Sequence, residues 1–463
     1  MYRDREEILE GTVCGVIFQN AENGYTVLRL RCGDGETVTV VGTIPMSVVG
    51  ERLMITGRWS THPSHGRQFE AEFLERLMPE TEQEILTYLS SRVLKGVGPK
   101  TAERIVAAFG RNSLDVLEQT PERLAELPGI SPAKAREIGE AFRRQVGIRR
   151  LMEFLMAHGL PAELAMRLYR VYGPESEQAL RENPYVLADP LYGADFTAVD
   201  QFALDLGLEG DDPRRVEAGV LFELTHNLSR GHTFLPRPKL REATAQLLDL
   251  TAEQAEAAMV RLTENGRMEC DRIAGLDACY LPRLYEAETE TAARLAKMAG
   301  TALEPPRDLV SLIRRAEQAQ GIAYAEAQKD AIRQALSHQV LIVTGGPGTG
   351  KTTTLGGILQ VFDLLGLKTQ LAAPTGRAAK RLSELTGREA ATIHRMLEVQ
   401  FSEETGEMVF AHDESDPLKA DAMIVDEVSM VDVLLMQALL RALPEDCRLI
   451  LVGDPDQLPS VGP

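Results

Sequence analysis

One stretch of the sequence decides the fold: Gly345-Gly346-Pro347-Gly348-Thr349-Gly350-Lys351-Thr352. It fits the pattern G-x-x-x-x-G-K-[ST] and directly follows an apolar run at 340–344, Val-Leu-Ile-Val-Thr. Glycines in such a loop let backbone N–H groups converge on phosphate oxygens, and the next helix points its N-terminus at the same charge. The stretch therefore predicts a strand, a phosphate-binding loop and a helix within an α/β domain.

The residue types in this loop predict that ATP and Mg²⁺ are the cofactors. Lys351 supplies a cation for the β and γ phosphates, and the Thr352 hydroxyl is placed to ligate magnesium. The Gly346-x-Gly348 spacing also occurs in dinucleotide sites, but the Lys-Thr that follows excludes that reading. We expect the nucleotide to contact Gly345, Gly346, Pro347, Gly348, Thr349, Gly350, Lys351, Thr352 and Thr353.

A pair of carboxylates completes the expected site. Asp426 and Glu427 end the apolar run 422–426, downstream of the phosphate-binding loop. We expect Asp426 to hold the magnesium and Glu427 to orient and deprotonate the attacking water. The alternative is an ordinary surface pair, since Asp-Glu is a common dipeptide.

Buried strands are expected at 340–344, 369–373, 422–426 and 448–452, because apolar runs there alternate with helical segments. That alternation predicts a parallel sheet covered on both faces. With the phosphate-binding loop, this sheet assigns residues 286–463 to an ATPase domain, which resembles the RecA-like domains.

Three further segments accompany the phosphate-binding loop, and clamp loaders and transporters with the same loop do not carry the last of them. They are Ala373-Pro374-Thr375-Gly376-Arg377-Ala378-Ala379-Lys380-Arg381-Leu382, Asp426-Glu427-Val428-Ser429-Met430 and Gly453-Asp454-Pro455-Asp456-Gln457-Leu458-Pro459-Ser460-Val461-Gly462. Together they resemble the RecD-like family of superfamily 1 DNA helicases. The resemblance extends over nearly the entire chain, to the long subfamily that works without the RecBC partners.

The resemblance implies roles for two glutamines. Gln328 is similar to the residue that recognises the adenine base. Gln457 is similar to the γ-phosphate sensor that links ATP hydrolysis to DNA binding. With Lys351, Asp426 and Glu427, Gln457 forms the expected catalytic set. For Gln328, a plain position on a helix surface is the alternative.

The resemblance also implies contacts with single-stranded DNA. Pro374, Thr375 and Arg377 are similar to a DNA-touching loop, and His394 lies in a further segment of that kind. A solvated surface charge is the alternative for Arg377, and a structural histidine is the alternative for His394.

The N-terminal residues 1–78 are expected to form a small OB-like β-barrel, since short alternating apolar runs are separated by turn residues. Residues 79–205 are helical and repetitive. Glycine turns recur at 96, 129, 159 and 193, and apolar residues recur six and nine positions after each of them. This spacing resembles tandem helix–hairpin–helix elements. A winged-helix-like connector is expected at 206–285, with a hairpin near Gly266 and Cys279.

Such a turn binds DNA phosphates through backbone N–H groups at a helix N-terminus, without reading sequence. We expect Gly96, Gly98, Lys100, Thr101 and Gly129 to contact DNA, and the third and fourth turns to be structural. Residues 91–150 contain twelve Lys or Arg and seven Asp or Glu, a local net charge of +5, whereas the whole chain has −19. Four arginines near the end of this stretch are expected to add to the basic surface: Arg143, Arg144, Arg149 and Arg150.

The pattern as a whole predicts an ATP-dependent DNA helicase acting on single-stranded DNA and on junctions with duplex, 5′ to 3′ as the resemblance implies. The five cysteines form no CxxC pair, which argues against a zinc site or a disulfide framework and favours reduced thiols in the cytoplasm. No membrane association or obligate protein partner is expected. Because no second motor domain with arginine fingers is found, slow hydrolysis and no unwinding are expected of this polypeptide alone.

Two other functions stay open at this point. One is a DNA-binding module whose ATPase site is a switch or a relic. The other is a phosphate-loop ATPase that acts on protein. Its rate of ATP hydrolysis would not change when oligonucleotides are added.

Overall fold

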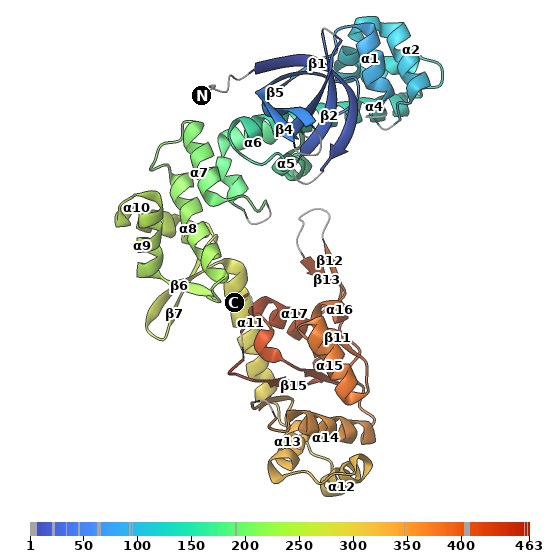
Figure 1. The fold of residues 1–463 in the computed structure, drawn as a ribbon. Helices are drawn as coiled ribbons and strands as arrows, with labels where there is room; N and C mark the ends of the chain where they lie inside the picture. The colour runs from blue at the N-terminus through green and yellow to red at the C-terminus, as the bar shows by residue number, and fades with distance from the viewer. Residues whose placement is uncertain are drawn as a thin grey trace. The chain divides into compact units, whose positions relative to one another are not determined.

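The computed structural model describes residues 7–20, 24–33, 35–44, 47–62, 66–91, 94, 96–189, 192–346, 348–401, 408–457, 459–460 and 462–463. The chain divides into two compact units, Met1–Glu209 and Gly210–Pro463 (Figure 1). Within the described ranges, no helix is both long and apolar enough to cross a membrane.

The first unit begins with a closed five-stranded barrel in the order β1-β2-β3-β5-β4. Alternating apolar residues fill its interior, among them Leu28, Leu53 and Phe69, which are fully buried. The predicted OB-like barrel is confirmed. Its strands are β1 (Glu7–Gln19), β2 (Tyr25–Cys32), β3 (Thr37–Thr43), β4 (Arg52–His62) and β5 (Gly66–Leu77).

The rest of the first unit is helical, and a helix follows each of the four predicted glycine turns. These helices are α2 (Pro99–Phe109), α4 (Pro132–Ala157), α5 (Leu164–Tyr172) and α7 (Phe196–Asp205). The repeating apolar positions are buried, as predicted: Ala102, Ile105, Ala135, Ile138, Ala165, Leu168, Val199 and Phe202. Helix α1 (Glu82–Ser90) precedes these helices, and between them lie η1 (Gly110–Asn112), α3 (Ser113–Gln119), η2 (Pro121–Glu126), η3 (Gly173–Glu175), α6 (Ser176–Glu182) and η4 (Pro184–Ala188).

The second unit opens with helices and a small three-stranded sheet ordered β6-β8-β7. Helix, strand, two helices and a hairpin follow one another, an order that is compatible with the predicted winged-helix-like connector. The hairpin predicted near Gly266 and Cys279 is formed by β7 and β8 and turns at Ala274-Gly275. The elements are α8 (Pro213–Leu228), β6 (Phe234–Pro236), α9 (Arg237–Leu248), α10 (Ala252–Glu264), β7 (Glu269–Ile273) and β8 (Leu276–Tyr280).

A five-stranded parallel sheet in the order β11-β10-β14-β15-β9 forms the centre of the remaining chain. Its strands are β9 (Val340–Thr344), β10 (Thr369–Ala373), β11 (Ala390–Thr392), β14 (Ala422–Val425) and β15 (Arg448–Gly453). Four of them match the predicted runs to within one residue at each end. The short edge strand β11 was not predicted.

Helices cover both faces of this sheet, as predicted. Ile450 packs with α12, α13 and α14, whereas Leu449 and Leu451 pack on the opposite face with α11, α16 and α17 (Figure 1). The elements are α11 (Pro282–Ala299), α12 (Leu309–Gln320), α13 (Glu326–Ser337), α14 (Lys351–Leu364), α15 (Gly376–Thr386), α16 (Ile393–Met396), η5 (Val428–Met430) and α17 (Val433–Ala442). A separate hairpin, β12 (Val399–Phe401) and β13 (Met408–Phe410), follows α16.

Candidate nucleotide and DNA sites

The predicted nucleotide residues gather at one edge of the parallel sheet. Strands β9, β10, β14 and β15 run in the same direction, so the loops after Thr344, Ala373, Val425 and Gly453 all leave from the carboxyl edge. In open α/β sheets, ligands bind outside this edge. The fold therefore brings the loops of all four quoted sequence segments to one place.

The phosphate-binding loop joins β9 directly to α14. Gly350 has φ +89° and ψ 15°, a left-handed conformation that favours glycine, and α14 starts at the next residue. The Lys351 ammonium turns back into the loop, where it donates to the carbonyl of Gly345 and, at 3.2 Å, to that of Gly346. Pro347 lies outside the described residues.

The threonines of the loop differ in exposure. The Thr349 hydroxyl donates to the Gly346 carbonyl at 2.9 Å, which closes the turn. Thr352 is exposed and Thr353 is half-buried on the first turn of α14. An exposed hydroxyl at Thr352 is accessible to a cation.

Gln328 lies beside this loop although it is far away in sequence. Its side-chain oxygen accepts the N–H of Ala325 at 2.9 Å, which fixes the amide at the start of α13. Its Nε2 atom is 2.8 Å from the position that a Cβ on Gly350 would take. The structure thus brings Gln328 to the loop and does not place it on a remote helix surface.

Asp426 follows β14 and is half-buried at the same edge. Burial raises the pKa of its carboxyl group above the usual range. The N–H of Glu427, 3.0 Å from Oδ1, and the positive charges of Arg381 and Lys351 act in the opposite direction. Lys351 and Asp426 are therefore close enough to interact electrostatically. The sequence had suggested no role for Arg381.

Glu427 adopts a left-handed backbone conformation, with φ 54° and ψ 42°. Such a conformation costs a residue with a Cβ about 1–2 kcal/mol, and strained residues of this kind cluster at functional sites. The turn redirects the chain into η5, and Val428 packs 2.9 Å from the position of a Cβ on Gly453. The Asp426-Glu427 turn and the loop after β15 are therefore in contact.

Gln457 lies in that second loop and is exposed. Its backbone N–H donates to the carbonyl of Asp454 at 3.2 Å, and its Nε2 donates to the buried carboxylate of the same residue at 3.4 Å. Asp454 thereby holds Gln457 at the carboxyl edge.

The predicted DNA-contacting residues of this unit lie at two neighbouring strand ends. Pro374 follows β10, and the Thr375 hydroxyl caps α15 by accepting the N–H of Ala378 at 3.2 Å. Arg377 is exposed on the first turn of α15. The His394 ring is half-buried, with its centroid 6.1 Å from that of Phe410 on β13.

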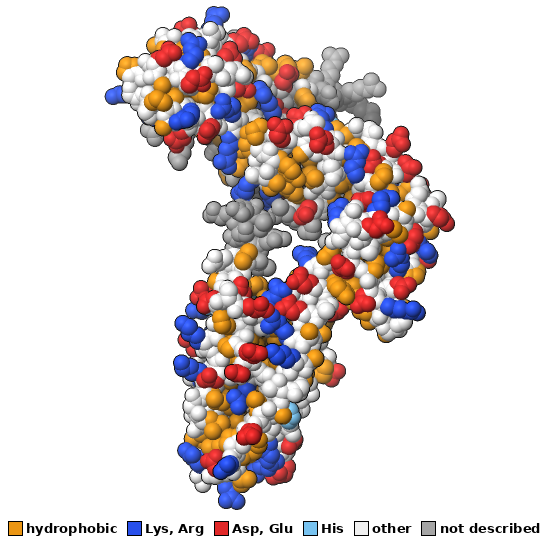
Figure 2. Space-filling view, turned by 180° about the vertical axis from the view of Figure 1, so that it is seen from behind, with side chains coloured by type: hydrophobic (Ala, Val, Ile, Leu, Met, Phe, Trp, Pro, Cys, Tyr) orange, Lys and Arg blue, Asp and Glu red, His pale blue; other side chains and the backbone are white. Residues whose placement is uncertain are grey.

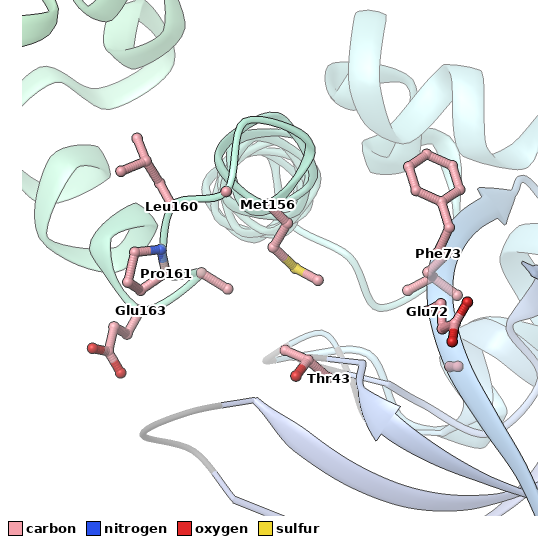
Figure 3. Close-up of a pocket in the computed structure, with 11 residues that line it drawn as sticks. Thr43, Glu72, Phe73, Met156, Leu160, Pro161 and Glu163 are labelled. Carbon is pink, nitrogen blue, oxygen red and sulfur yellow. The ribbon is translucent and has the colours of Figure 1, made fainter. Parts of the chain in front are cut away.

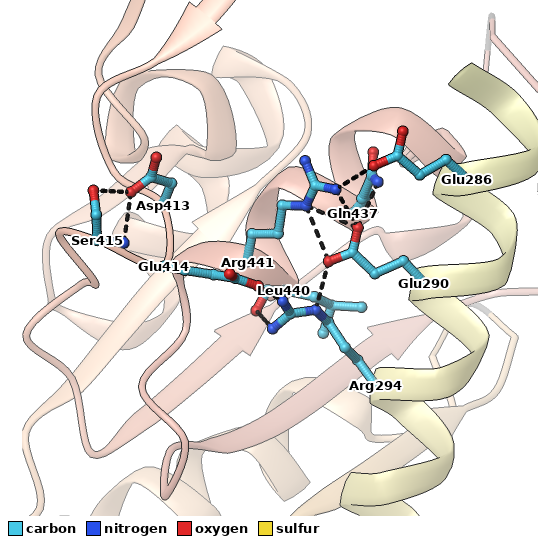
Figure 4. Close-up of polar contacts among 9 residues, drawn as sticks. All are labelled: Glu286, Glu290, Arg294, Asp413, Glu414, Ser415, Gln437, Leu440 and Arg441. Carbon is cyan, nitrogen blue, oxygen red and sulfur yellow. Dashed lines mark hydrogen bonds and ion pairs between the residues drawn. The ribbon is translucent and has the colours of Figure 1, made fainter. Parts of the chain in front are cut away.

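A cluster of charged side chains links α11 to α17, the helix that follows the Asp426 turn. Arg441 binds Glu286 at 2.8 Å and Glu290 at 2.5 Å, and Arg294 binds Glu290 at 2.8 Å (Figure 4). Gln437 adds a further hydrogen bond of 2.7 Å to Glu290. These donors, Arg441 foremost, lower the pKa of Glu290 to about 2.

The first glycine turn of the helical region presents a helix N-terminus without a side-chain cap. Gly98 is the N-cap of α2, and its carbonyl accepts the N–H groups of Thr101 and Ala102 at 2.9 Å. Lys100 on the first turn is exposed, whereas Thr101 is buried. This arrangement leaves the start of α2 open to an anion.

The four turns form two similar pairs. Arg104 donates to the carbonyl of Pro128, directly before Gly129, and Arg167 donates to the carbonyl of Tyr192 at 2.8 Å, directly before Gly193. Each arginine lies eight residues after the first glycine of its pair, 96 or 159. The helical region thus contains the same two-turn unit twice.

The second pair differs where an anion would bind. Asp195 caps α7 by accepting the N–H of Ala198 at 3.1 Å, which places a carboxylate at that N-terminus. The third turn borders a pocket of about 480 Å³ next to barrel strand β5, with Met156 pointing into the space and Glu72 and Glu163 on its rim (Figure 3). Two carboxylates at this pocket oppose phosphate binding, in line with the predicted structural role.

Arg149 is a correction to the expected basic surface. It is 8% exposed, and its guanidinium binds Glu51 of the barrel at 3.1 Å and the Tyr88 hydroxyl at 3.2 Å. Arg76 binds the same Glu51 at 3.0 Å. Arg143, Arg144 and Arg150 are exposed. Figure 2 shows basic and acidic side chains interspersed on the face that it presents.

Comparison with known families agrees with this architecture. Residues 6–79 match the OB-fold domain of the ATP-dependent DNA helicase YrrC, and residues 88–144 match a SAM-like helix-hairpin-helix tandem. Residues 144–234 match the HHH domain of the ATP-dependent RecD2 DNA helicase, and residues 328–463 match an AAA domain.

Several curated proteins are similar in sequence. The ATP-dependent RecD2 DNA helicase of Deinococcus radiodurans is 32% identical over 475 residues, which cover 98% of this chain and 64% of the relative. The RecBCD enzyme subunit RecD of Mycolicibacterium smegmatis is 42% identical over 29% of this chain and 28% of its own length. The helicase dda of Enterobacteria phage T4 is 38% identical over 29% of this chain and 30% of its own length. The chain thus spans less than two thirds of each of these relatives.

Proposed function

Because the chain belongs to the RecD-like family of DNA helicases, we propose that it supplies the ATP-binding domain and a DNA-binding region of an ATP-driven DNA motor. The placement of Lys351 and Asp426 carries this proposal. Both lie at the carboxyl edge of the sheet, near enough for the lysine to favour the ionised aspartate. The lysine binds the phosphates and the carboxylate binds the Mg²⁺ that the same phosphates coordinate, so the two side chains must lie close together. The placement of Lys351 and Asp426 allows this.

The residues of the loop fit a triphosphate with Mg²⁺. The uncapped N-terminus of α14 and the backbone of 345–350 would bind phosphate oxygens, and Lys351 would neutralise their charge. Thr352 and Asp426 would hold the metal, and Gln328 would contact the base. When bound, MgATP supplies the phosphoryl group whose transfer to water drives the motor.

The remaining residues would act on the attacking water and would couple ATP hydrolysis to DNA binding. Glu427, held in its turn beside Asp426, would orient the attacking water and accept its proton. Gln457, anchored by Asp454, would sense the γ-phosphate. Pro374, Thr375, Arg377 and His394 would contact the DNA strand from neighbouring loops.

The front end would bind the DNA backbone without reading sequence. The open start of α2, with Gly98 and Lys100, and the second turn at Gly129 would hold phosphates. We propose single-stranded DNA and its junctions with duplex as the substrate, translocation 5′ to 3′, and action in the cytoplasm in DNA repair. Membranes and obligate protein partners have no part in this proposal.

A binding experiment on the 463-residue chain tests the proposal. A fluorescent ATP analogue with Mg²⁺ should bind the wild-type chain, and Lys351→Ala should weaken this binding at least 10-fold while leaving oligonucleotide binding within about 2-fold. A chain that binds DNA but no nucleotide would instead be a DNA-binding module with a relic site. A chain that binds nucleotide but no DNA would fit an ATPase that acts on protein.

A further inference from the structure

Two cysteines face each other across the hairpin of the winged-helix-like connector. Cys270 on β7 pairs directly with Cys279 on β8, and their Sγ atoms are 3.6 Å apart. The hairpin closes with Ile273 opposite Leu276 around a two-residue turn. Counting back from this closing pair, the two cysteines occupy a pair that exchanges no backbone hydrogen bonds.

A pair of that type suits a disulfide. The Cα atoms of directly opposed residues without mutual hydrogen bonds lie about 4.5 Å apart, which is within the range of about 4.4–6.8 Å that disulfides span. The two sulfurs are already in contact, so side-chain rotation alone can bring them to bonding distance. The backbone of the hairpin need not open.

The two thiols have different surroundings. Cys279 is fully buried, whereas Cys270 is partly exposed and lies 3.6 Å from the Arg237 guanidinium and 3.7 Å from the Thr263 hydroxyl. The hydrogen bond with Cys279, followed by those of Thr263 and the charge of Arg237, lowers the pKa of Cys270. The same hydrogen bond and burial raise the pKa of Cys279. A partly exposed thiol with a lowered pKa and a buried thiol therefore lie side by side, which is the arrangement of a reactive and a resolving cysteine.

We propose that Cys270 and Cys279 form a reversible disulfide site, in which Cys270 is the reactive thiolate and hydrogen peroxide is the oxidant. The Cys270 thiolate attacks one peroxide oxygen, the O–O bond breaks, and the released hydroxide takes up a proton to become water. The Cys279 thiol then attacks the sulfenic sulfur of Cys270. The S–O bond breaks, and the hydroxyl leaves as water with the Cys279 proton.

The reaction is balanced in atoms and in electrons. Two thiols lose two electrons, and one peroxide is reduced to two waters. A dithiol reductant reverses the process by thiol–disulfide exchange. The site is separate from the nucleotide residues, so it stands or fails independently of the proposed motor function.

Peptide mapping offers a direct test, because Arg272 lies between the two cysteines. Trypsin places Cys270 in peptide 268–272 and Cys279 in peptide 273–283. After equimolar peroxide and alkylation of the remaining thiols, these two peptides should appear joined, and dithiothreitol should separate them. Cys14, Cys32 and Cys447 serve as internal controls and should be recovered alkylated. Recovery of Cys270 and Cys279 fully alkylated, like the controls, would overturn the proposal.

Two cysteine variants assign the roles, and a third variant tests the contribution of Arg237. Cys279→Ser should stop the reaction at the sulfenic acid of Cys270, which dimedone captures, whereas Cys270→Ser should leave Cys279 as a free thiol. Arg237→Gln should slow joining of the peptides at pH 7 at least 3-fold. A dimedone adduct on Cys279 in the Cys270→Ser chain, at the rate seen for Cys270, would contradict the assignment.

Discussion

The side-chain amide of Gln328 lies against Gly350, the last glycine of the phosphate-binding loop, with Nε2 2.8 Å from where a Cβ on that glycine would be. The same amide is anchored by the N–H of Ala325. A residue expected to contact the base thus lies directly beside the loop expected to hold the phosphates. This arrangement makes position 350 sensitive to any side chain.

Gly350→Ala should weaken binding of an ATP analogue at least 10-fold. The added methyl group would collide with Gln328, and the left-handed backbone at φ +89° costs a residue with a Cβ about 1–2 kcal/mol. Gly387→Ala is the matched control, because Gly387 also has a left-handed backbone, with φ +67°, no described atom lies within 4 Å of a Cβ there, and it lies outside the phosphate-binding loop. Titration with the fluorescent analogue compares the two. Equal affinities of both variants would show that the loop tolerates a side chain at 350.

Gly98→Asp should stabilise α2 yet weaken DNA binding. Gly98 has φ −99° and ψ 175°, and no described atom lies within 4 Å of a Cβ there, so the fold accepts the change. The carboxylate would cap the helix as Asp195 caps α7, and it would repel a DNA phosphate. We expect at least a 5-fold loss of oligonucleotide affinity by fluorescence anisotropy, with little loss for the neutral Gly98→Asn. Equal losses for both substitutions would point to capping, not charge.

Glu51→Gln should destabilise the first unit by about 3 kcal/mol. The Glu51 side chain is 4% exposed and binds both Arg76 and Arg149, so its removal leaves two buried cations without their main counter-charge. Glu10→Gln is the control, because Glu10 forms an exposed ion pair with Arg52 that is worth less than about 1 kcal/mol. Thermal unfolding compares the two, and a similar shift in Tm for both would contradict the account.

Glu290 should give the second unit a stability contribution that depends on pH. Its pKa is about 2 in the folded chain and 4.5 for an unperturbed glutamate. The folded pKa is the lower one, so the contribution is present above about pH 4.5 and is lost as the pH falls towards 2. Glu290→Gln should therefore lower the free energy of unfolding at pH 7 and at pH 5 equally, by roughly 1–2 kcal/mol. Urea unfolding at pH 3 should show a smaller difference, and an undiminished one would refute the pKa shift.

Long apolar runs and glycine motifs made much of the fold predictable. The run 340–344 became β9 without change, and the buried positions after Gly96 and Gly129 followed from spacing alone. The edge strand β11 escaped prediction because Ala390-Ala391-Thr392 carries too little apolar signal.

Tertiary partners explain what the sequence could not indicate. Charge counting treated Arg149 as a surface cation, but it faces Glu51, which lies about a hundred residues earlier in the chain. Arg381 likewise lies near Asp426 only through the packing of α15 against the sheet. The fold places the predicted nucleotide side chains at one edge, and their individual roles remain predictions.

The central claim is that Lys351 and Asp426 act on one metal-bound triphosphate. A double-mutant cycle in MgATP-analogue binding tests it most directly, with Lys351→Ala, Asp426→Asn and their combination. If both side chains act on the same metal-bound triphosphate, each single change should weaken binding at least 10-fold. The combination should then weaken binding by much less than the product of the two single effects. Fully multiplicative losses, or unchanged binding in either single variant, would contradict the claim.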